Sequence, residues 1–224
     1  MKLDPLAVAI LNHKGGVGKT TVAHVLAQIA AQKGLKVTAY DLDEQRNLTD
    51  SLSLVELPKL KIKTRIDKGD ENDGTDLYIL DCPPALSFTT DEAISFADII
   101  IMPVPPSLYS ISNLDVLFTR IEDHGKGREQ VAIVKNCFDD SRLSRELDDF
   151  LTGKGYPVAG RLPLSRRLRG NLSSGLIWNH AMREKERAPF VSLLDSVLRA
   201  FEMLSAGKPS TAWEGEKENA GNEV

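Results

Sequence analysis

The residues best suited to chemistry lie in one glycine-rich stretch near the start of the chain. Residues 12–21 read Asn-His-Lys-Gly-Gly-Val-Gly-Lys-Thr-Thr and follow the apolar run of residues 6–11. The glycines let the backbone turn N–H groups inward around an anion, and a helix N-terminus directly behind them adds its dipole. Lys19 is spaced to reach nucleotide β- and γ-phosphates, and the Thr20 hydroxyl is the kind of oxygen ligand that Mg²⁺ prefers. The stretch therefore predicts a phosphate-binding loop.

The alternative is a glycine-rich turn that matches this pattern by chance. The context argues against it, because a strand-like apolar run precedes the loop and helical spacing follows it to about Lys33. We expect ATP contacts from the loop and the first helical turn, at Gly15, Gly16, Val17, Gly18, Lys19, Thr20 and Thr21.

Acidic residues follow two later apolar runs. Asp41 and Asp43 come after residues 35–40, and Asp81 ends the run of residues 76–81. A carboxylate at the C-terminal end of a parallel strand lies near bound phosphates and can hold a water molecule by hydrogen bonding. The alternatives are an acidic strand-to-helix loop with Asn47 as a helix cap, and an Asp81 that caps the next helix.

Lys14 departs from an ordinary phosphate loop, which needs only Lys19. With this second lysine, KGGVGKTT resembles the deviant Walker A motif of the ParA/MinD family of P-loop ATPases. The resemblance implies that Lys14 crosses a dimer interface to the partner's nucleotide, and that Lys14, Lys19 and Asp43 are the catalytic residues. Asp43 would position the attacking water.

The same resemblance extends to the metal site. It implies Mg²⁺ near Thr20, with Asp41 supporting its shell and Asp81 holding it through water, since Asp81-Cys82-Pro83-Pro84 is similar to the family's Walker B element. Glu44 stands where the family usually has proline, which leaves the path of this loop open because proline would have fixed φ.

The C-terminal half carries weaker signals. Residues 136–139, Asn-Cys-Phe-Asp, resemble the family's Asn-x-Tyr-Asp segment, and Pro163 matches its proline beside the adenine, so Asn136 and Pro163 are expected nucleotide contacts. Four arginines lie within nine residues, namely Arg161, Arg166, Arg167 and Arg169. They predict either contact with DNA phosphates or a solvated helix face, and both interpretations stay open.

Composition argues against a globally basic DNA-binding protein, a disulfide-rich protein and a membrane-spanning protein. The chain has 224 residues and a net charge of −4, so any binding of non-specific DNA must come from a local patch. Cys82 and Cys137 are the only cysteines, which fits a reducing cytosol and argues against a disulfide scaffold. No apolar run approaches membrane-spanning length, so we expect no membrane attachment. The resemblance implies a cytoplasmic, nucleoid-associated protein.

Apolar runs alternate with helical patterns along the chain. We expect strands at residues 6–11, 35–40, 60–63, 76–81, 98–104 and 130–135, and helices at 19–33, 47–54, 85–96, 110–124, 141–154 and 188–205. This order predicts an α/β fold with a doubly wound, mainly parallel sheet and helices on both faces, as in P-loop NTPases. We expect one domain over residues 1–206 and a polar, disordered tail over 207–224.

Within the family, the chain resembles a short plasmid-type ParA partition ATPase. That resemblance implies MgATP binding, slow hydrolysis, a nucleotide-dependent homodimer, and a separate ParB-like centromere-binding protein, because an N-terminal DNA-reading domain is not expected here. Three alternatives stay open: a MinD-like ATPase at the membrane, a metabolic P-loop enzyme, and a ParA relative that positions a protein cluster. The acidic, glycine-broken tail argues against the first and Lys14 against the second.

Overall fold

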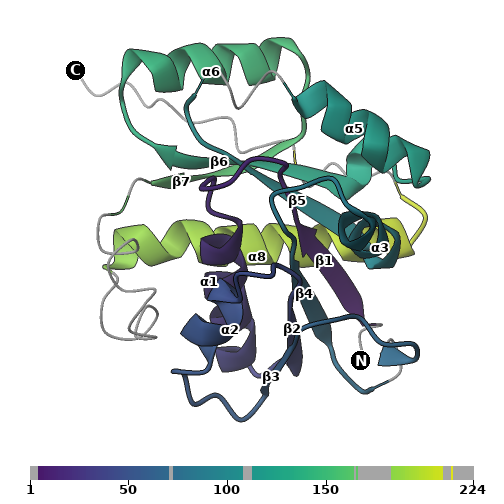
Figure 1. Cartoon of the computed structure of the whole chain (residues 1–224). Helices are drawn as coiled ribbons and strands as arrows, with labels where there is room; N and C mark the ends of the chain where they lie inside the picture. Colours follow the sequence, from purple (N-terminus) through teal and green to yellow (C-terminus); the bar gives the residue numbers. More distant parts are fainter. Residues whose placement is uncertain are drawn as a thin grey trace.

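The chain folds around one parallel β-sheet, described here from a computed structural model (Figure 1). The structure describes residues 5–70, 73–107, 113–163, 165, 183–208 and 213. Seven strands lie in the order β3-β2-β4-β1-β5-β6-β7, and every pair between them is parallel. The strands are β1 (Leu6–Ile10), β2 (Val37–Asp41), β3 (Leu60–Lys63), β4 (Leu77–Asp81), β5 (Ile99–Val104), β6 (Val131–Phe138) and β7 (Val158–Pro163). The expected doubly wound fold is confirmed.

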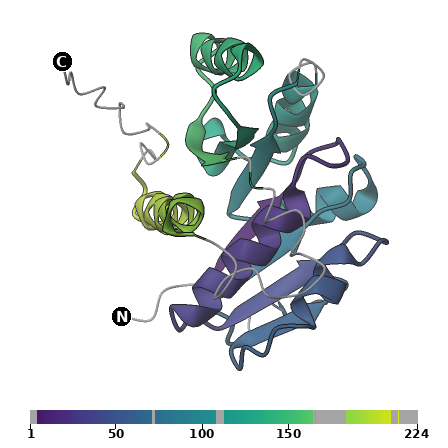
Figure 2. The ribbon, with the colours of Figure 1, turned by 90° about the vertical axis from the view of Figure 1, so that its left-hand side faces the viewer.

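Helices cover both faces of the sheet, since successive side chains of a strand point to opposite sides. Leu6, Val8 and Ile10 of β1 pack in the cluster that includes α1 and α8, whereas Ala7 and Ala9 pack toward α3, α5 and α6. In Figure 2, α8 (yellow-green) is seen nearly end-on, on the side opposite α3 and α5. The helices are α1 (Lys19–Gln32), α2 (Asn47–Leu52), α3 (Phe88–Phe96), α5 (Leu114–Asp123), α6 (Arg142–Gly153) and α8 (Glu184–Ser205).

Local capping chemistry sets several helix starts. The α3 helix begins at Phe88 rather than at residue 85, because the Ser87 hydroxyl accepts a hydrogen bond from the Thr90 N–H (3.4 Å). The residue before α2 is Arg46, which adopts a left-handed φ of 55°, so the alternative in which Asn47 caps this helix is wrong. Asn47 is instead the first residue of that helix.

The sheet is larger than the sequence predicts. Residues 158–163 form an unexpected edge strand, β7, and β6 runs on to Phe138, three residues beyond its expected end. A register shift between Asn136 and Phe138 leaves Cys137 outside the regular pairing, with a φ of 58°. Asn136, beside this irregularity, donates a hydrogen bond to the Val17 carbonyl of the phosphate loop and contributes to the site below.

The boundary between residues 206 and 207 stays a prediction, but one residue of the expected tail is packed. Trp213 is 5% exposed, and its indole N–H donates to the Glu129 carbonyl at 2.8 Å. Its ring lies in the core cluster on the α1 and α8 side of the sheet. Within the described part of the chain, no helix has the length and apolar character needed to cross a membrane.

Candidate nucleotide site

The glycine loop between β1 and α1 is held in shape by its own polar groups. The Asn12 side-chain amide donates to the Pro103 carbonyl (2.9 Å), and its oxygen accepts from the Lys14 N–H (3.1 Å). Gly18 precedes α1 with a φ of 98°, a backbone conformation that side chains disfavour. A Cβ at Gly18 would also lie 2.2 Å from the Asn136 amide nitrogen. This loop therefore requires glycine at that position for two independent reasons.

Lys19 is a buried cation at the start of α1. Its side chain closes the loop, since Nζ donates to the Lys14 carbonyl at 3.2 Å, and the residue is 7% exposed. Burial lowers the pKa of Lys19, while the charge of Asp81 acts to raise it. A buried ammonium of this kind gains most from a phosphate, which supplies charge-assisted hydrogen bonds without solvent.

Two of the predicted acids lie side by side below the loop. Asp41 and Asp81 end β2 and β4, where they are register partners, and both are almost fully buried. One Asp41 oxygen accepts from the Thr49 N–H at 2.8 Å, whereas its other oxygen has no partner among the described residues. Burial raises the pKa of Asp81 to about 7. The Thr20 hydroxyl acts to lower the pKa of Asp81, but neither oxygen of Asp81 makes a hydrogen bond of good geometry within the described residues. Buried carboxylate oxygens without partners fit the water shell of a divalent cation.

No three His, Cys, Asp or Glu residues in the described ranges converge closely enough to hold a metal by themselves. Mg²⁺ is commonly held by one or two protein groups together with substrate phosphates and waters. The Thr20 hydroxyl with the free oxygens of Asp41 and Asp81 fits that donor set.

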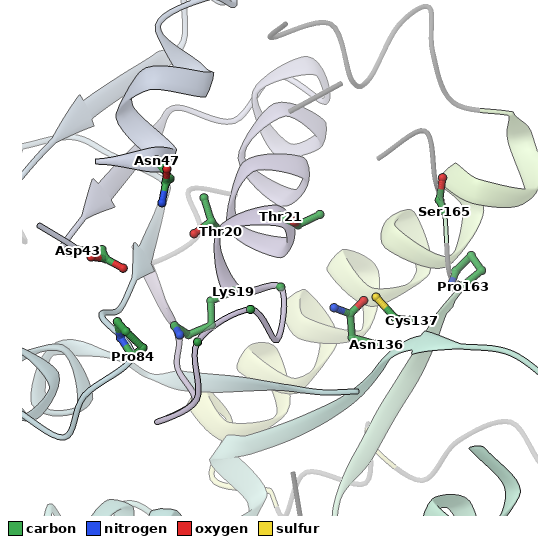
Figure 3. A pocket seen from close by; sticks show the side chains of 13 residues that line it. Lys19, Thr20, Thr21, Asp43, Asn47, Pro84, Asn136, Cys137, Pro163 and Ser165 are labelled. Carbon is green, nitrogen blue, oxygen red and sulfur yellow. The ribbon is translucent and has the colours of Figure 1, made fainter. Parts of the chain in front are cut away.

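A cavity of about 320 Å³ opens above the loop, a size within the range of ligand pockets, about 300–1,000 Å³. Figure 3 shows that Lys19 and Thr20 at its base face Asp43 on one side, with Asn136 and Pro163 on the other. The lining residues are Gly15, Gly16, Gly18, Lys19, Thr20, Thr21, Asp43, Asn47, Pro84, Asn136, Cys137, Pro163 and Ser165. The structure thus brings most of the predicted nucleotide contacts together.

Asn136 links the far side of the cavity to the loop. It is 6% exposed, and its amide nitrogen donates to the Val17 carbonyl at 2.7 Å. That bond uses one of the two N–H donors of the amide, which leaves the second N–H and the carbonyl oxygen for other partners. Val17, a predicted nucleotide contact, is buried and does not line the cavity. Its backbone carbonyl accepts the hydrogen bond from Asn136.

Other predicted residues lie outside the cavity. Lys14 does not line it, and its Nζ donates to the Ser107 hydroxyl at 3.4 Å. Arg161 pairs with Asp140 at 3.2 Å, and its side chain is 41% exposed. Arg166, Arg167 and Arg169 lie outside the described residues.

Sequence reasoning did not name four lining residues as contacts: Asn47, Pro84, Cys137 and Ser165. Pro84 and Cys137 lie inside motifs that the sequence analysis quotes, so their place in those motifs was an available signal. Ser165 carries no local signal, because its hydroxyl is placed by a bond to Glu186 (2.7 Å), which is 21 residues away.

Comparison with known proteins agrees with this geometry. A sequence profile described as the CobQ/CobB/MinD/ParA nucleotide binding domain (CbiA) matches residues 8–176. The chain therefore belongs to this family of nucleotide-binding domains, which has the P-loop fold described above.

Individual relatives place the chain near partition and positioning proteins. It is 30% identical over 154 residues to the chromosome-partitioning ATPase Soj of Thermus thermophilus, covering 52% of this chain and 61% of Soj. The fold resembles the Cyanothece McdA–ATP complex (TM-score 0.74, 17% identity, 89% of this chain and 97% of that one). It also resembles a plasmid partition protein from Borrelia burgdorferi (TM-score 0.67, 16% identity, 88% and 99%). The chain spans less than two thirds of the length of the first curated relatives that it matches.

Proposed function

We propose that this protein binds MgATP, hydrolyses it slowly, and uses the nucleotide state to partition DNA. The observation that supports this best is the convergence of Lys19, Thr20 and Asp43 on one cavity, above the paired carboxylates of Asp41 and Asp81. The similarity to Soj and to a plasmid partition protein favours partition as the process.

In this proposal the chain positions the nucleotide from both ends. The loop N–H groups and Lys19 hold the phosphates, while Asn136 and Pro163 flank the base. Bound Mg²⁺ would neutralise charge on the phosphates, with Thr20 as its protein ligand and Asp41 and Asp81 holding its water shell. Asp43 accepts from the Gln45 N–H through one oxygen (3.0 Å) and keeps the other to orient a water molecule.

Assembly and DNA binding complete the proposal. Lys14 would leave Ser107 and contact phosphates in a second copy of the chain, which makes the homodimer dependent on ATP. Two copies would pair their arginine patches, Arg161, Arg166, Arg167 and Arg169, and bind DNA without sequence preference through its phosphates. A separate ParB-like protein would supply the specificity and stimulate hydrolysis, in a cytoplasmic, nucleoid-associated setting.

A second candidate follows from the likeness to McdA and from 36% identity over 115 residues to a carboxysome-distribution protein of Gloeobacter kilaueensis. In that case the cargo would be a protein cluster, and the same ATPase cycle on DNA would position it.

Single-turnover hydrolysis tests the catalytic assignment. Asp43→Ala should bind ATP normally and hydrolyse it about a hundredfold more slowly, because positioned proton acceptors are worth factors of that order. Glu44→Ala is the matched control, since it removes the neighbouring exposed carboxylate. If Asp43→Ala hydrolyses ATP at the parental rate and Glu44→Ala hydrolyses it slowly, then Glu44 and not Asp43 positions the attacking water.

A further inference from the structure

A buried chain of hydrogen bonds joins the phosphate-loop helix α1 to the short helix α2. The Gln28 amide nitrogen lies 2.5 Å from Nε2 of His24, and Nδ1 of His24 lies 2.8 Å from the Ser51 hydroxyl. That hydroxyl lies 3.1 Å from the Leu48 carbonyl. The three polar side chains are 0%, 2% and 4% exposed for His24, Gln28 and Ser51.

The orientation of the Gln28 amide and the Leu48 carbonyl together favour one direction for these bonds. An amide nitrogen only donates, so Nε2 of His24 accepts from Gln28 and the ring proton lies on Nδ1. A carbonyl only accepts, so the Ser51 hydroxyl donates to Leu48 and accepts from Nδ1 of His24. With a neutral imidazole, both ring nitrogens of His24 and the Ser51 hydroxyl have hydrogen-bond partners. Burial lowers the pKa of His24 to about 4, which keeps the ring neutral.

This connection is one of a few contacts that hold the short helix α2 in place. The helix has only six residues, of which Leu48, Ser51 and Leu52 are buried, and helices this short are unstable alone. Two apolar side chains hold it against the core but tolerate rotation about its axis. The bond from Ser51 to His24, together with the Thr49 N–H bond to Asp41, restrains that rotation, since hydrogen bonds weaken steeply with angle.

The other end of α2 leads directly to Asp43. Arg46, the residue before α2, donates its N–H to the Asp43 carbonyl (3.1 Å), and the Asp50 N–H inside the helix bonds the Arg46 carbonyl (2.9 Å). The Thr49 N–H holds Asp41 from the same helix. A rotation of α2 therefore moves the backbone that carries Asp43 relative to Lys19 and the loop.

We infer that His24 and Ser51 are positioning residues that hold Asp43 in register with the phosphate loop through α2. The inference rests on the proposed role of Asp43 in hydrolysis. It assigns a second, buried layer to the site. Helix α1 carries Lys19 at its start, and His24, which orients α2, lies five residues further along the same helix.

A double-mutant cycle tests this inference. Ser51→Ala should lower the single-turnover rate of MgATP hydrolysis by about tenfold, since small misplacements of a reacting group cost factors of ten to a hundred. Its affinity for MgATP should stay within about twofold, because the phosphate loop is untouched. In an Asp43→Ala background, Ser51→Ala should have no further effect, since the group it positions is gone. Ser196→Ala is the matched control, as it removes a buried serine hydroxyl from α8 and should leave the rate unchanged.

The possible outcomes separate this inference from the proposed function. A parental rate in Asp43→Ala would overturn the role of Asp43 and the inference with it. A slow Asp43→Ala protein in which Ser51→Ala still reduces the rate tenfold would keep the role of Asp43 and overturn the inference alone. A Ser51→Ala protein that loses ATP affinity together with rate would show a purely structural role, which also contradicts it.

A second measurement uses the unaltered protein. Nitrogen-15 NMR of the imidazole at neutral pH should show His24 protonated at Nδ1, the tautomer that free histidine does not prefer. Protonation at Nε2 would contradict the direction of the hydrogen-bond chain.

Discussion

Gly18 is the residue at which the phosphate loop is least tolerant of change. Its φ of 98° is a backbone conformation that residues with a side chain disfavour. A Cβ at this position would also lie only 2.2 Å from the Asn136 amide nitrogen. We predict that Gly18→Ala lowers the free energy of unfolding by about 2 kcal/mol or more, the cost of a strained backbone and a displaced amide. Gly15→Ala is the control, because no atom lies within 4 Å of its added carbon, and urea unfolding of both variants measures the difference. Equal stability of the two would contradict the described contact between Gly18 and Asn136.

Lys19 is the residue on which nucleotide affinity should depend most. Lys19→Ala removes the buried ammonium, and we expect ATP affinity to fall by about a hundredfold, as for loss of charge-assisted hydrogen bonds. Titration calorimetry with MgATP measures this, with Lys33→Ala as control, since that lysine pairs with Asp195 at the far end of α1. Near-parental affinity in Lys19→Ala would contradict the phosphate-loop assignment.

At the scale of elements, the junction of α1 and α2 predicts a pH dependence of stability. The pKa of His24 falls from its ordinary 6.5 to about 4 on folding, so the unfolded chain binds the proton more readily. The free energy of unfolding therefore keeps its full value, as far as His24 is concerned, above pH 6.5. It decreases as the pH falls from 6.5 toward 4, because the unfolded chain takes up a proton that the folded chain does not. The loss should reach about 2.5 kcal/mol at pH 4.5.

Urea unfolding at pH 7 and pH 4.5 measures this loss. A His24→Gln variant should be less stable at pH 7 but should lack this part of the pH dependence. A parent and variant whose stabilities fall equally between the two pH values would show that His24 is not the group responsible.

Sequence patterns predicted the elements whose signals are local. The phosphate loop and the acids after β2 and β4 are contiguous motifs, so spacing along the chain was enough to identify them. The edge strand β7 was not predicted, because Val158–Pro163 contains a glycine and a proline and is largely half-buried, without strict alternation. Its identity as a strand depends on pairing with β6.

Contacts between distant residues account for the rest of what the sequence did not predict. The bond from Asn136 to Val17 joins residues 119 positions apart, and the bond from His24 to Ser51 joins residues 27 apart. Nothing in the local pattern of α1 distinguishes His24 from another packed histidine. Such pairs become visible only when the topology of the sheet brings their elements together.

At the scale of the whole molecule, Trp213 predicts where the folded unit ends. A chain ending at residue 206 should be less stable than one ending at residue 213 by about 2 kcal/mol, the value of burying one large side chain. Thermal unfolding of the two truncated proteins and of the full chain measures this. Equal stability of both truncated proteins would contradict the packing of Trp213 against Glu129 and the core.

In the proposed function, ATP bound in this site joins two copies of the chain through Lys14. Sedimentation velocity of Asp43→Ala, which should retain its nucleotide, tests it with MgATP and with MgADP. We predict dimers with MgATP, monomers with MgADP, and monomers with either nucleotide when Lys14→Ala is added. Monomers in saturating MgATP for Asp43→Ala, with nucleotide binding intact, would contradict the account.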